Sequence, residues 1–210
     1  MMTIHRIVSG PWRQNGYVID SGDGSALIVD PGGDEATFHA RLSQSQLTPC
    51  AILNTHAHYD HLGAVCALMA AYNVPFYLHG GDSALLRQAN LYRMLFAASE
   101  MIRVPTNFKD LALAGDRLQI GSFDIGLLPT PGHTKGSMCF LIADAMFSGD
   151  TLLPAGTGRI DLPGGSASEM ENSLARIALL PGCLMMYPGH GDALSLAQAM
   201  AKAQYRSKIA

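Results

Sequence analysis

The chain has 210 residues, 48% of them hydrophobic and 15% charged, and a formal net charge of -3. This composition is typical of a globular protein and excludes a disordered chain. The acidic balance, with no run of lysines and arginines, argues against a nucleic-acid-binding protein. The first residues lack the apolar core of a signal peptide and no segment is long and apolar enough for a membrane span, so we expect a cytoplasmic protein without a membrane partner.

The length fits one domain with a sizeable core, or two tightly joined halves. We expect a single domain over residues 1–210 and a monomer. The four cysteines stand far apart and form no Cys-x-x-Cys pair. Free thiols in a reducing cytoplasm are therefore expected rather than disulfides.

Short apolar runs separated by turn residues open the chain, and they predict an antiparallel meander. The sequence Asp30-Pro31-Gly32-Gly33 ends it in a tight turn that permits close backbone approach. Apolar spacing then predicts a helix over 34–47, a strand over 51–53, a helix over 62–72 and a strand over 74–78. Asp60 is a candidate cap for the second of these helices. The order strand, helix, strand implies parallel neighbours.

Residues 80–108 are apolar and rich in methionine. A core helix is the first interpretation, since an apolar helical stripe usually faces a core. The alternative is a flap over a functional site, in which Tyr92, Met94 and Phe96 touch a substrate.

The pattern restarts near residue 109. Strands are predicted over 117–120, 123–128, 138–143, 145–147 and 184–187, and helices over 167–180 and 193–205. Each half, about 1–108 and 109–210, is thus a meander followed by helix, strand and helix. Two sheets packed face to face with helices outside satisfy this order, which makes the chain an α/β protein.

The run from His56 to His61 contains three histidines and a carboxylate and follows an apolar strand. In an extended chain His56 and His58 point the same way, and a turn can bring Asp60 and His61 to the same place. Crowded imidazoles and a carboxylate are ligands suited to zinc, iron or manganese. The isolated histidines are predicted to be structural residues: His5, His39 and His79.

Three later turns each place one more candidate ligand directly after a predicted strand: His133, Asp150 and His190. Taken singly, a histidine after Pro-Gly is more often a turn residue. Jointly, the three turns and the first motif supply seven ligands. Seven are too many for one four-coordinate metal and suit two metals that share a bridging carboxylate.

The combined motifs resemble the metallo-β-lactamase superfamily and, within it, glyoxalase II (hydroxyacylglutathione hydrolase) and its short single-domain bacterial relatives. The motifs are His56-x-His58-x-Asp60-His61, Pro131-Gly132-His133-Thr134-x-Gly136-Ser137, Gly149-Asp150-Thr151-Leu152 and Gly189-His190. The resemblance covers nearly the whole chain. It implies the αβ/βα four-layer sandwich, two mixed sheets flanked by helices, with the site at one edge between the sheets.

The same resemblance assigns the ligands. His56, His58 and His133 are expected to hold one metal, and Asp60, His61 and His190 the other. Asp150 is expected to bridge them, and the carboxylates Asp60 and Asp150 are the candidate catalytic residues. Two divalent ions are implied, with zinc first and iron or manganese as alternatives.

Two metal ions ~3.5–4 Å apart lower the pKa of a shared water to about 7 and supply a bridging hydroxide that attacks a carbonyl. A thioester suits such a site because its thiolate leaves readily. A serine triad is not expected, since no Gly-x-Ser-x-Gly elbow is present. The implied activity is hydrolysis of S-lactoylglutathione to lactate and glutathione, in methylglyoxal detoxification.

Two further residues match the family. Asp30, in its Asp-Pro-Gly turn, is expected to support the metal-binding histidines from behind. Arg159 matches a basic position that meets the glycine carboxylate of glutathione, whereas Asp161 stands where an aromatic residue is common. Full-length glyoxalase II also has a C-terminal glutathione-binding helical domain, which these 210 residues do not contain as a separate unit.

Rival functions share the scaffold. β-Lactamases usually lack an Asp at the position of Asp150. Persulfide dioxygenases use one iron and have a loop similar to Gly158-Arg159-x-Asp161, but often carry a Cys at the position of Ser137. Hydrolysis of another small ester or lactone is a further alternative. A non-enzymatic member normally loses some ligands, and all seven are present here.

Overall fold

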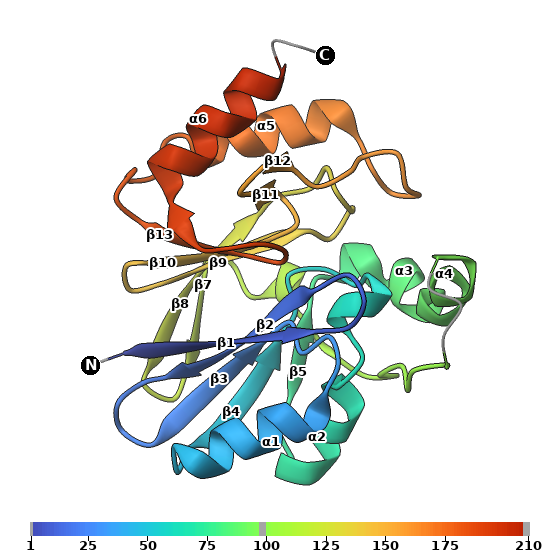
Figure 1. The fold of residues 1–210 in the computed structure, drawn as a ribbon, viewed down its shortest axis with the longest axis vertical. Coiled ribbons are helices and arrows are strands. Elements are labelled where there is room, and N and C mark those ends of the chain that lie inside the picture. Colours follow the sequence, from blue (N-terminus) through green and yellow to red (C-terminus); the bar gives the residue numbers. More distant parts are fainter. Residues whose placement is uncertain (1, 97–99, 208–210) are drawn as a thin grey trace.

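The computed structural model describes residues 2–96 and 100–207. Two six-stranded sheets face each other and helices cover their outer surfaces, α1 and α2 on one side and α5 and α6 on the other (Figure 1). The strand orders are β1-β2-β3-β4-β5-β6 and β14-β13-β10-β9-β8-β7. The predicted four-layer arrangement is therefore confirmed.

The first sheet begins with the predicted antiparallel meander and continues with parallel strands. Its strands are β1 (Thr3–Ser9), β2 (Gln14–Asp20), β3 (Ser25–Val29), β4 (Thr48–Leu53), β5 (Phe76–Leu78) and β6 (Lys109–Asp110). Helix α1 (Glu35–Gln44) connects β3 to β4, and α2 (Val65–Tyr72) connects β4 to β5. The parallel pairing of β4 with β5 agrees with the predicted crossover.

Asp60 does not cap a helix, contrary to the prediction. It lies inside a short 3₁₀ helix (Tyr59–His61), and α2 begins only at Val65, after Ala64. The side chain of Asp60 is turned toward His190, 3.3 Å away, and is thus unable to bond the first turn of α2. The predicted helix is present but begins at Val65 instead of Leu62, and the Asp60 carboxylate faces the histidine cluster.

Residues 80–108 do not form one core helix. They contain a 3₁₀ turn (Gly80–Asp82) and two short helices, α3 (Ser83–Arg87) and α4 (Ala89–Phe96); residues 97–99 lie outside the described part of the chain. Only Ala89 of α4 is buried. The helix lies at the side of the sandwich instead of beneath a sheet (Figure 1): Ala89 and Tyr92 pack against the neighbouring core cluster, while Leu91, Met94, Leu95 and Phe96 remain exposed.

The second sheet repeats the plan of the first. Its strands are β7 (Arg117–Ile120), β8 (Phe123–Pro129), β9 (Met138–Ile142), β10 (Ala145–Gly149), β13 (Met185–Pro188) and β14 (Leu194–Ser195). A small hairpin of β11 (Leu152–Leu153) and β12 (Gly156–Thr157) follows β10. Helices α5 (Ala167–Ile177) and α6 (Leu196–Ser207) cover the outer face, and the Ser166 side chain caps α5.

The core lies in three layers. Side chains such as Tyr17, Leu53 and Phe140 fill the space between the sheets and are almost fully buried. Separate clusters lie beneath α1 and α2 and beneath α5 and α6. Burial at these three interfaces holds the sheets rigidly, so residues at their edges have fixed relative positions. No helix in the described residues is long and apolar enough to cross a membrane.

Candidate metal centre

The functional residues lie at one edge, where strands from both sheets end. β3, β4 and β5 are parallel, and β8, β10 and β13 also run in a common direction. The carboxyl ends of parallel strands open toward ligands in α/β proteins. Each predicted motif begins directly after one of these strands, so the fold brings together all seven residues that the sequence singled out.

The first group of ligands consists of His56, His58 and His133, all buried. One ligand atom from each lies within 4.8 Å of the others. The Nδ1 atom of His58 and the Nε2 atom of His133 are 2.9 Å apart. Two imidazole nitrogens that face each other at this distance can direct their lone pairs at one cation.

The second group consists of Asp60, His61 and His190, which again lie within 4.8 Å of one another. The Nε2 atom of His190 is 3.3 Å from Asp60 Oδ2, and that of His61 is 3.9 Å from the same oxygen. His61 is fully buried, while the side chains of Asp60 and His190 are 19% and 26% exposed. This group is therefore the more open of the two.

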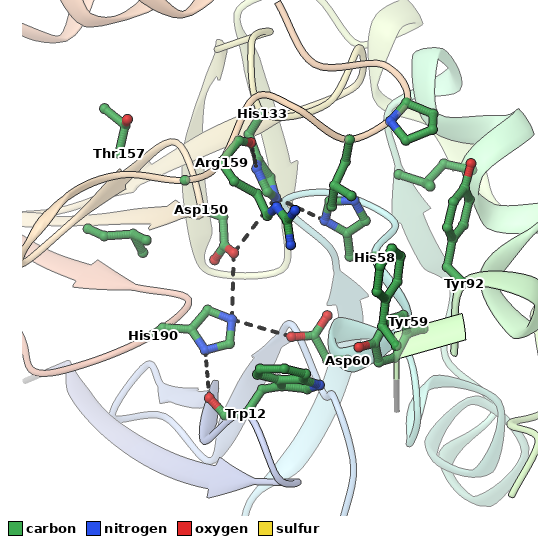
Figure 2. A pocket seen from close by; sticks show the side chains of 16 residues that line it. Trp12, His58, Tyr59, Asp60, Tyr92, His133, Asp150, Thr157, Arg159 and His190 are labelled. Atoms are coloured by element: carbon green, nitrogen blue, oxygen red, sulfur yellow. Dashed lines mark hydrogen bonds and ion pairs between the residues drawn. The ribbon is translucent and has the colours of Figure 1, made fainter. Parts of the chain in front are cut away.

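Asp150 lies between the groups (Figure 2). Its Oδ2 atom is 3.7 Å from His133 Nε2 and 3.5 Å from His190 Nε2, and its Oδ1 atom is 3.6 Å from His61 Nε2. One carboxylate thus faces imidazoles of both groups. This is the position a bridging ligand requires.

The bonding of buried atoms fits metal ions. Among the described residues, four buried side-chain atoms have no hydrogen-bond partner, and three belong to the centre: His56 Nε2, His61 Nε2 and Asp150 Oδ1. Leaving such atoms unpaired is costly unless something else binds them. The donor set of imidazole nitrogens and carboxylate oxygens suits zinc, iron or manganese. The chain therefore carries a His/Asp metal site.

The two groups differ in their proton affinity. Burial, followed by the neighbouring His133, lowers the pKa of His58 to about 3, and burial also lowers the pKa of His56. Burial alone lowers the pKa of His61 too, but the carboxylates of Asp60, Asp30 and Asp150 outweigh it and raise this pKa to about 9. His56 and His58 are therefore neutral at pH 7, whereas His61 of the second group holds a proton when no cation is bound.

Asp30 supports the centre from behind. Its Oδ2 atom is 3.1 Å from His61 Nδ1, the ring nitrogen opposite the one that faces Asp60. It also accepts hydrogen bonds from the backbone N–H and hydroxyl group of Thr55, at 2.7 and 2.6 Å. The Thr55 hydroxyl lies 3.1 Å from His56 Nδ1. Asp30 is therefore connected to one histidine of each group, His61 directly and His56 through Thr55. Its positive φ of 47° marks a strained backbone conformation at this position.

The turn after Asp30 packs directly against the histidine loop. The N–H of Gly63 donates to the carbonyl of Gly32 at 2.9 Å. A Cβ atom on Gly63 would lie 2.1 Å from that carbonyl oxygen. The predicted close backbone approach at this turn is thus present, and it requires glycine.

Two polar residues of β2, which the sequence did not single out, support the centre from behind. The Asn15 side chain donates to the carbonyls of Pro188 and Gly191 at 2.9 and 2.7 Å, on either side of His190. The Gln14 side chain donates to the Asp30 carbonyl at 2.9 Å and lies 3.3 Å from His61 Nδ1. Two buried amides in a strand of apolar residues were the available signal.

A cavity of about 330 Å³ opens over the centre. Its floor includes His58, Asp60, His133, Asp150 and His190 (Figure 2). The walls are mainly apolar, and they are formed by Trp12, Tyr59, Leu85, Tyr92, Phe96, Leu153, Leu162 and Pro163. Tyr92 and Phe96 therefore meet the cavity as the alternative interpretation of α4 required, whereas Met94 does not line it.

Arg159 has two different contacts at the rim of the cavity. Its backbone carbonyl lies 2.7 Å from His133 Nδ1 and orients that imidazole. Its guanidinium donates to both carboxylate oxygens of Asp161, each at 2.8 Å, while the side chain remains 56% exposed. The predicted cation therefore faces the cavity, and its charge is already paired.

Comparison with known proteins assigns the fold to a family. Residues 9–190 match the model of the metallo-beta-lactamase superfamily. A probable metallo-hydrolase, YqgX of Bacillus subtilis, is 36% identical over 197 residues, 90% of each chain. A hydroxyacylglutathione hydrolase of Xanthomonas axonopodis is 34% identical over 88% of this chain, which spans 64% of that protein.

Solved structures agree. The B3 metallo-β-lactamase BLEG-1 has a TM-score of 0.90 at 34% identity, with 97% of this chain and 99% of that chain covered. The di-iron-bound form of TTHA1623 has a TM-score of 0.86 at 32% identity, with 96% and 99% covered. The predicted sandwich is confirmed by these neighbours as well as by the sheet order.

Proposed function

This chain is a metallo-hydrolase of the metallo-β-lactamase superfamily, and we propose that its reaction is the hydrolysis of glutathione thioesters such as S-lactoylglutathione. The observation that carries the proposal is the pair of three-residue groups joined by Asp150 beneath an apolar cavity. The hydroxyacylglutathione hydrolase among the relatives supports this substrate class.

In this proposal His56, His58 and His133 would hold one divalent ion, Asp60, His61 and His190 would hold a second, and Asp150, which faces both groups, would be shared between them. Ions bound there supply a nucleophilic water of lowered pKa and polarise the carbonyl to be attacked. Zinc is the first choice of metal, with iron and manganese accepted by the same donors.

The protein groups around the ions orient the substrate. The apolar walls that include Trp12 and Tyr92 enclose the acyl carbon and the thioester sulfur and limit access of bulk water. Arg159, at the rim, meets the carboxylate of the thiol portion.

The charges of the site favour a thioester over an amide. Burial by itself raises the pKa of Asp60, but His61 and His190 outweigh it and hold this pKa well below its usual range. Asp60 is therefore ionised and cannot protonate a leaving group. A thiolate leaves without protonation near neutral pH because thiols have a pKa of about 8.5, whereas an amine cannot.

The test is an assay of one metal-loaded preparation against S-lactoylglutathione, a small lactone, a chromogenic cephalosporin and glutathione persulfide. We expect thiol release from the thioester with the highest kcat/KM, and loss of this activity in His133→Ala. The cephalosporin is included because of the likeness to BLEG-1. A higher kcat/KM for opening of the cephalosporin than for the thioester would overturn the thioester assignment.

A persulfide dioxygenase is the second candidate, because the Gly158-Arg159-x-Asp161 loop resembles that of these enzymes. It requires one iron and consumes oxygen. Oxygen uptake with glutathione persulfide, together with a single iron per chain, would favour it over the hydrolase. The complete second group of ligands, Asp60, His61 and His190, favours the hydrolase.

A further inference from the structure

Asp82 is a buried carboxylate that lies outside the seven ligands. It ends the 3₁₀ turn after β5 and is 1% exposed. Its Oδ2 atom accepts hydrogen bonds from the N–H of Ala57 and from the hydroxyl of Thr134, both at 2.9 Å. Its Oδ1 atom accepts from the N–H of Gly136 at 2.7 Å. One side chain thus bonds two loops that come from different sheets.

These bonds fall on the residues next to the first group of ligands. Ala57 separates His56 from His58, and Thr134 directly follows His133. Each of the three histidines is therefore adjacent in sequence to a residue that is hydrogen-bonded to Asp82. Among the described residues, Asp82 makes no hydrogen bond to Asp60, His61 or His190 themselves; its nearest bonded neighbour, Ala57, precedes Asp60 by three residues.

The carboxylate has no cationic partner. None of the ion pairs among the described residues includes Asp82. Burying a charge of this kind is unfavourable unless hydrogen bonds compensate it. An uncharged residue at this position would therefore stabilise the fold at least as well as Asp82 does. Its three hydrogen bonds are 2.7–2.9 Å long. A Cβ atom on Gly136 would lie 2.7 Å from Asp82 Cγ, so the contact has no room for a side chain at residue 136.

We propose that Asp82 is a positioning residue for the first metal: it fixes the spacing between the loop of His56 and His58 and the loop of His133. The inference rests on the proposed two-metal centre. Loss of its bonds lets the two loops separate, which weakens the three-histidine group selectively. The second group is held by other contacts, those of Asp30 and Asn15, and does not depend on Asp82.

The experiment measures Zn²⁺ affinity in two backgrounds by competition with a chromogenic chelator. His190→Ala leaves the three-histidine group complete, and His133→Ala leaves the Asp60, His61 and His190 group complete. Asp82→Asn keeps the shape but places an NH₂ group against at least one N–H or hydroxyl donor. We expect it to weaken zinc binding about 10–100-fold in the first background and less than about threefold in the second.

Asp110→Asn is the matched control. Asp110 accepts from the N–H groups of Gly80 and Ala112, at 2.7 and 2.9 Å, in the same region but away from the ligand loops. It is expected to change zinc affinity in neither background. Thr134→Val removes a single bond to Asp82 and should weaken the first site, and Thr134→Ser should restore it. This pair keeps the inference testable if Asp82→Asn does not fold.

Equal weakening in both backgrounds, or none in either, with no effect of Thr134→Val, would overturn the role of Asp82 and leave the proposed function standing. Failure of the unaltered chain to bind zinc, iron or manganese would overturn the proposed function itself, and the positioning role with it.

Discussion

The two groups of ligands differ in burial, charge and support although they share Asp150. The three-histidine group is buried, contains no carboxylate, and is supported by Asp82 through Ala57 and Thr134 and by Asp30 through Thr55. The group of Asp60, His61 and His190 is partly exposed to the cavity, contains a carboxylate and is braced by Asp30 and Asn15.

This difference indicates that the two groups bind their metals in different ways. Three buried imidazoles, of which those of His56 and His58 have lowered pKa values, favour a metal that binds without displacing a proton from these two rings. A carboxylate and two histidines at the cavity wall form a group that exchanges a proton for a metal and lies where a substrate arrives. The predictions below test this contrast in order of expected effect.

Removal of the shared carboxylate should have the largest effect. Asp150→Ala is expected to lower kcat/KM for S-lactoylglutathione by about 10³-fold or more, because both groups lose a ligand and the transition state loses its fixed electrostatic surroundings. Asp144→Ala is the control, because Asp144 lies in the exposed turn between β9 and β10, at the opposite end of β10 from Asp150. A variant at Asp150 that keeps a tenth of the activity would contradict the bridging role.

Asp30→Asn should weaken metal binding about 10–100-fold. Asn tolerates the positive φ at this position, so the substitution removes the charge that orients His61 without adding backbone strain. Elemental analysis after dialysis measures the loss, and Asp34→Asn, at another positive φ nearby, is the control. Unchanged metal content in Asp30→Asn would remove Asp30 from the centre.

The two groups should also differ in proton release. The pKa of His61 is raised to about 9, so this ring is protonated at pH 7.5 in the metal-free protein and must lose its proton to bind a metal. Affinity of the second group should therefore rise up to about pH 9 and level off above it. The pKa of His58 is lowered to about 3 and that of His56 is also lowered, so neither ring should have to release a proton to bind a metal near neutrality.

Calorimetry in two buffers of different ionisation enthalpy measures this directly. His133→Ala, which keeps the second group, should release about one proton per metal at pH 7.5. His190→Ala, which keeps the first, should release fewer. Equal release from the two variants would erase the distinction between the groups.

The smallest effect is expected outside both groups. Asp161→Ala frees the guanidinium of Arg159 for a substrate carboxylate, and we expect KM for S-lactoylglutathione to fall about two- to fivefold, as for other exposed ion pairs. KM for an uncharged thioester and the metal content should not change. A rise in KM for the anionic substrate would show that Asp161 helps to bind it.

The seven ligands could be predicted because their signal is local. His56, His58 and His61 lie within six residues, and His133 and His190 each follow a Pro-Gly turn after a strand. Their convergence follows from strand direction, which the order of apolar runs already implied.

The supporting residues could not be predicted in the same way. Asp82 reads as the end of a Gly-Gly-Asp turn, and its role exists only because residues 57 and 134, far apart in sequence, meet at its side chain. The same is true of Gln14 and Asn15, whose partners lie across the molecule. The interpretation of residues 80–108 as a core helix was wrong because apolar content alone does not distinguish a core face from a cavity wall.

The central claim is that the chain holds two metal ions, one in each group, with Asp150 between them. Anomalous diffraction from crystals of the metal-loaded protein, collected above and below the absorption edge of the metal, tests it most directly. Two peaks are predicted, one among His56, His58 and His133 and one among Asp60, His61 and His190. A single peak, or a metal bound away from these six side chains, would contradict the account.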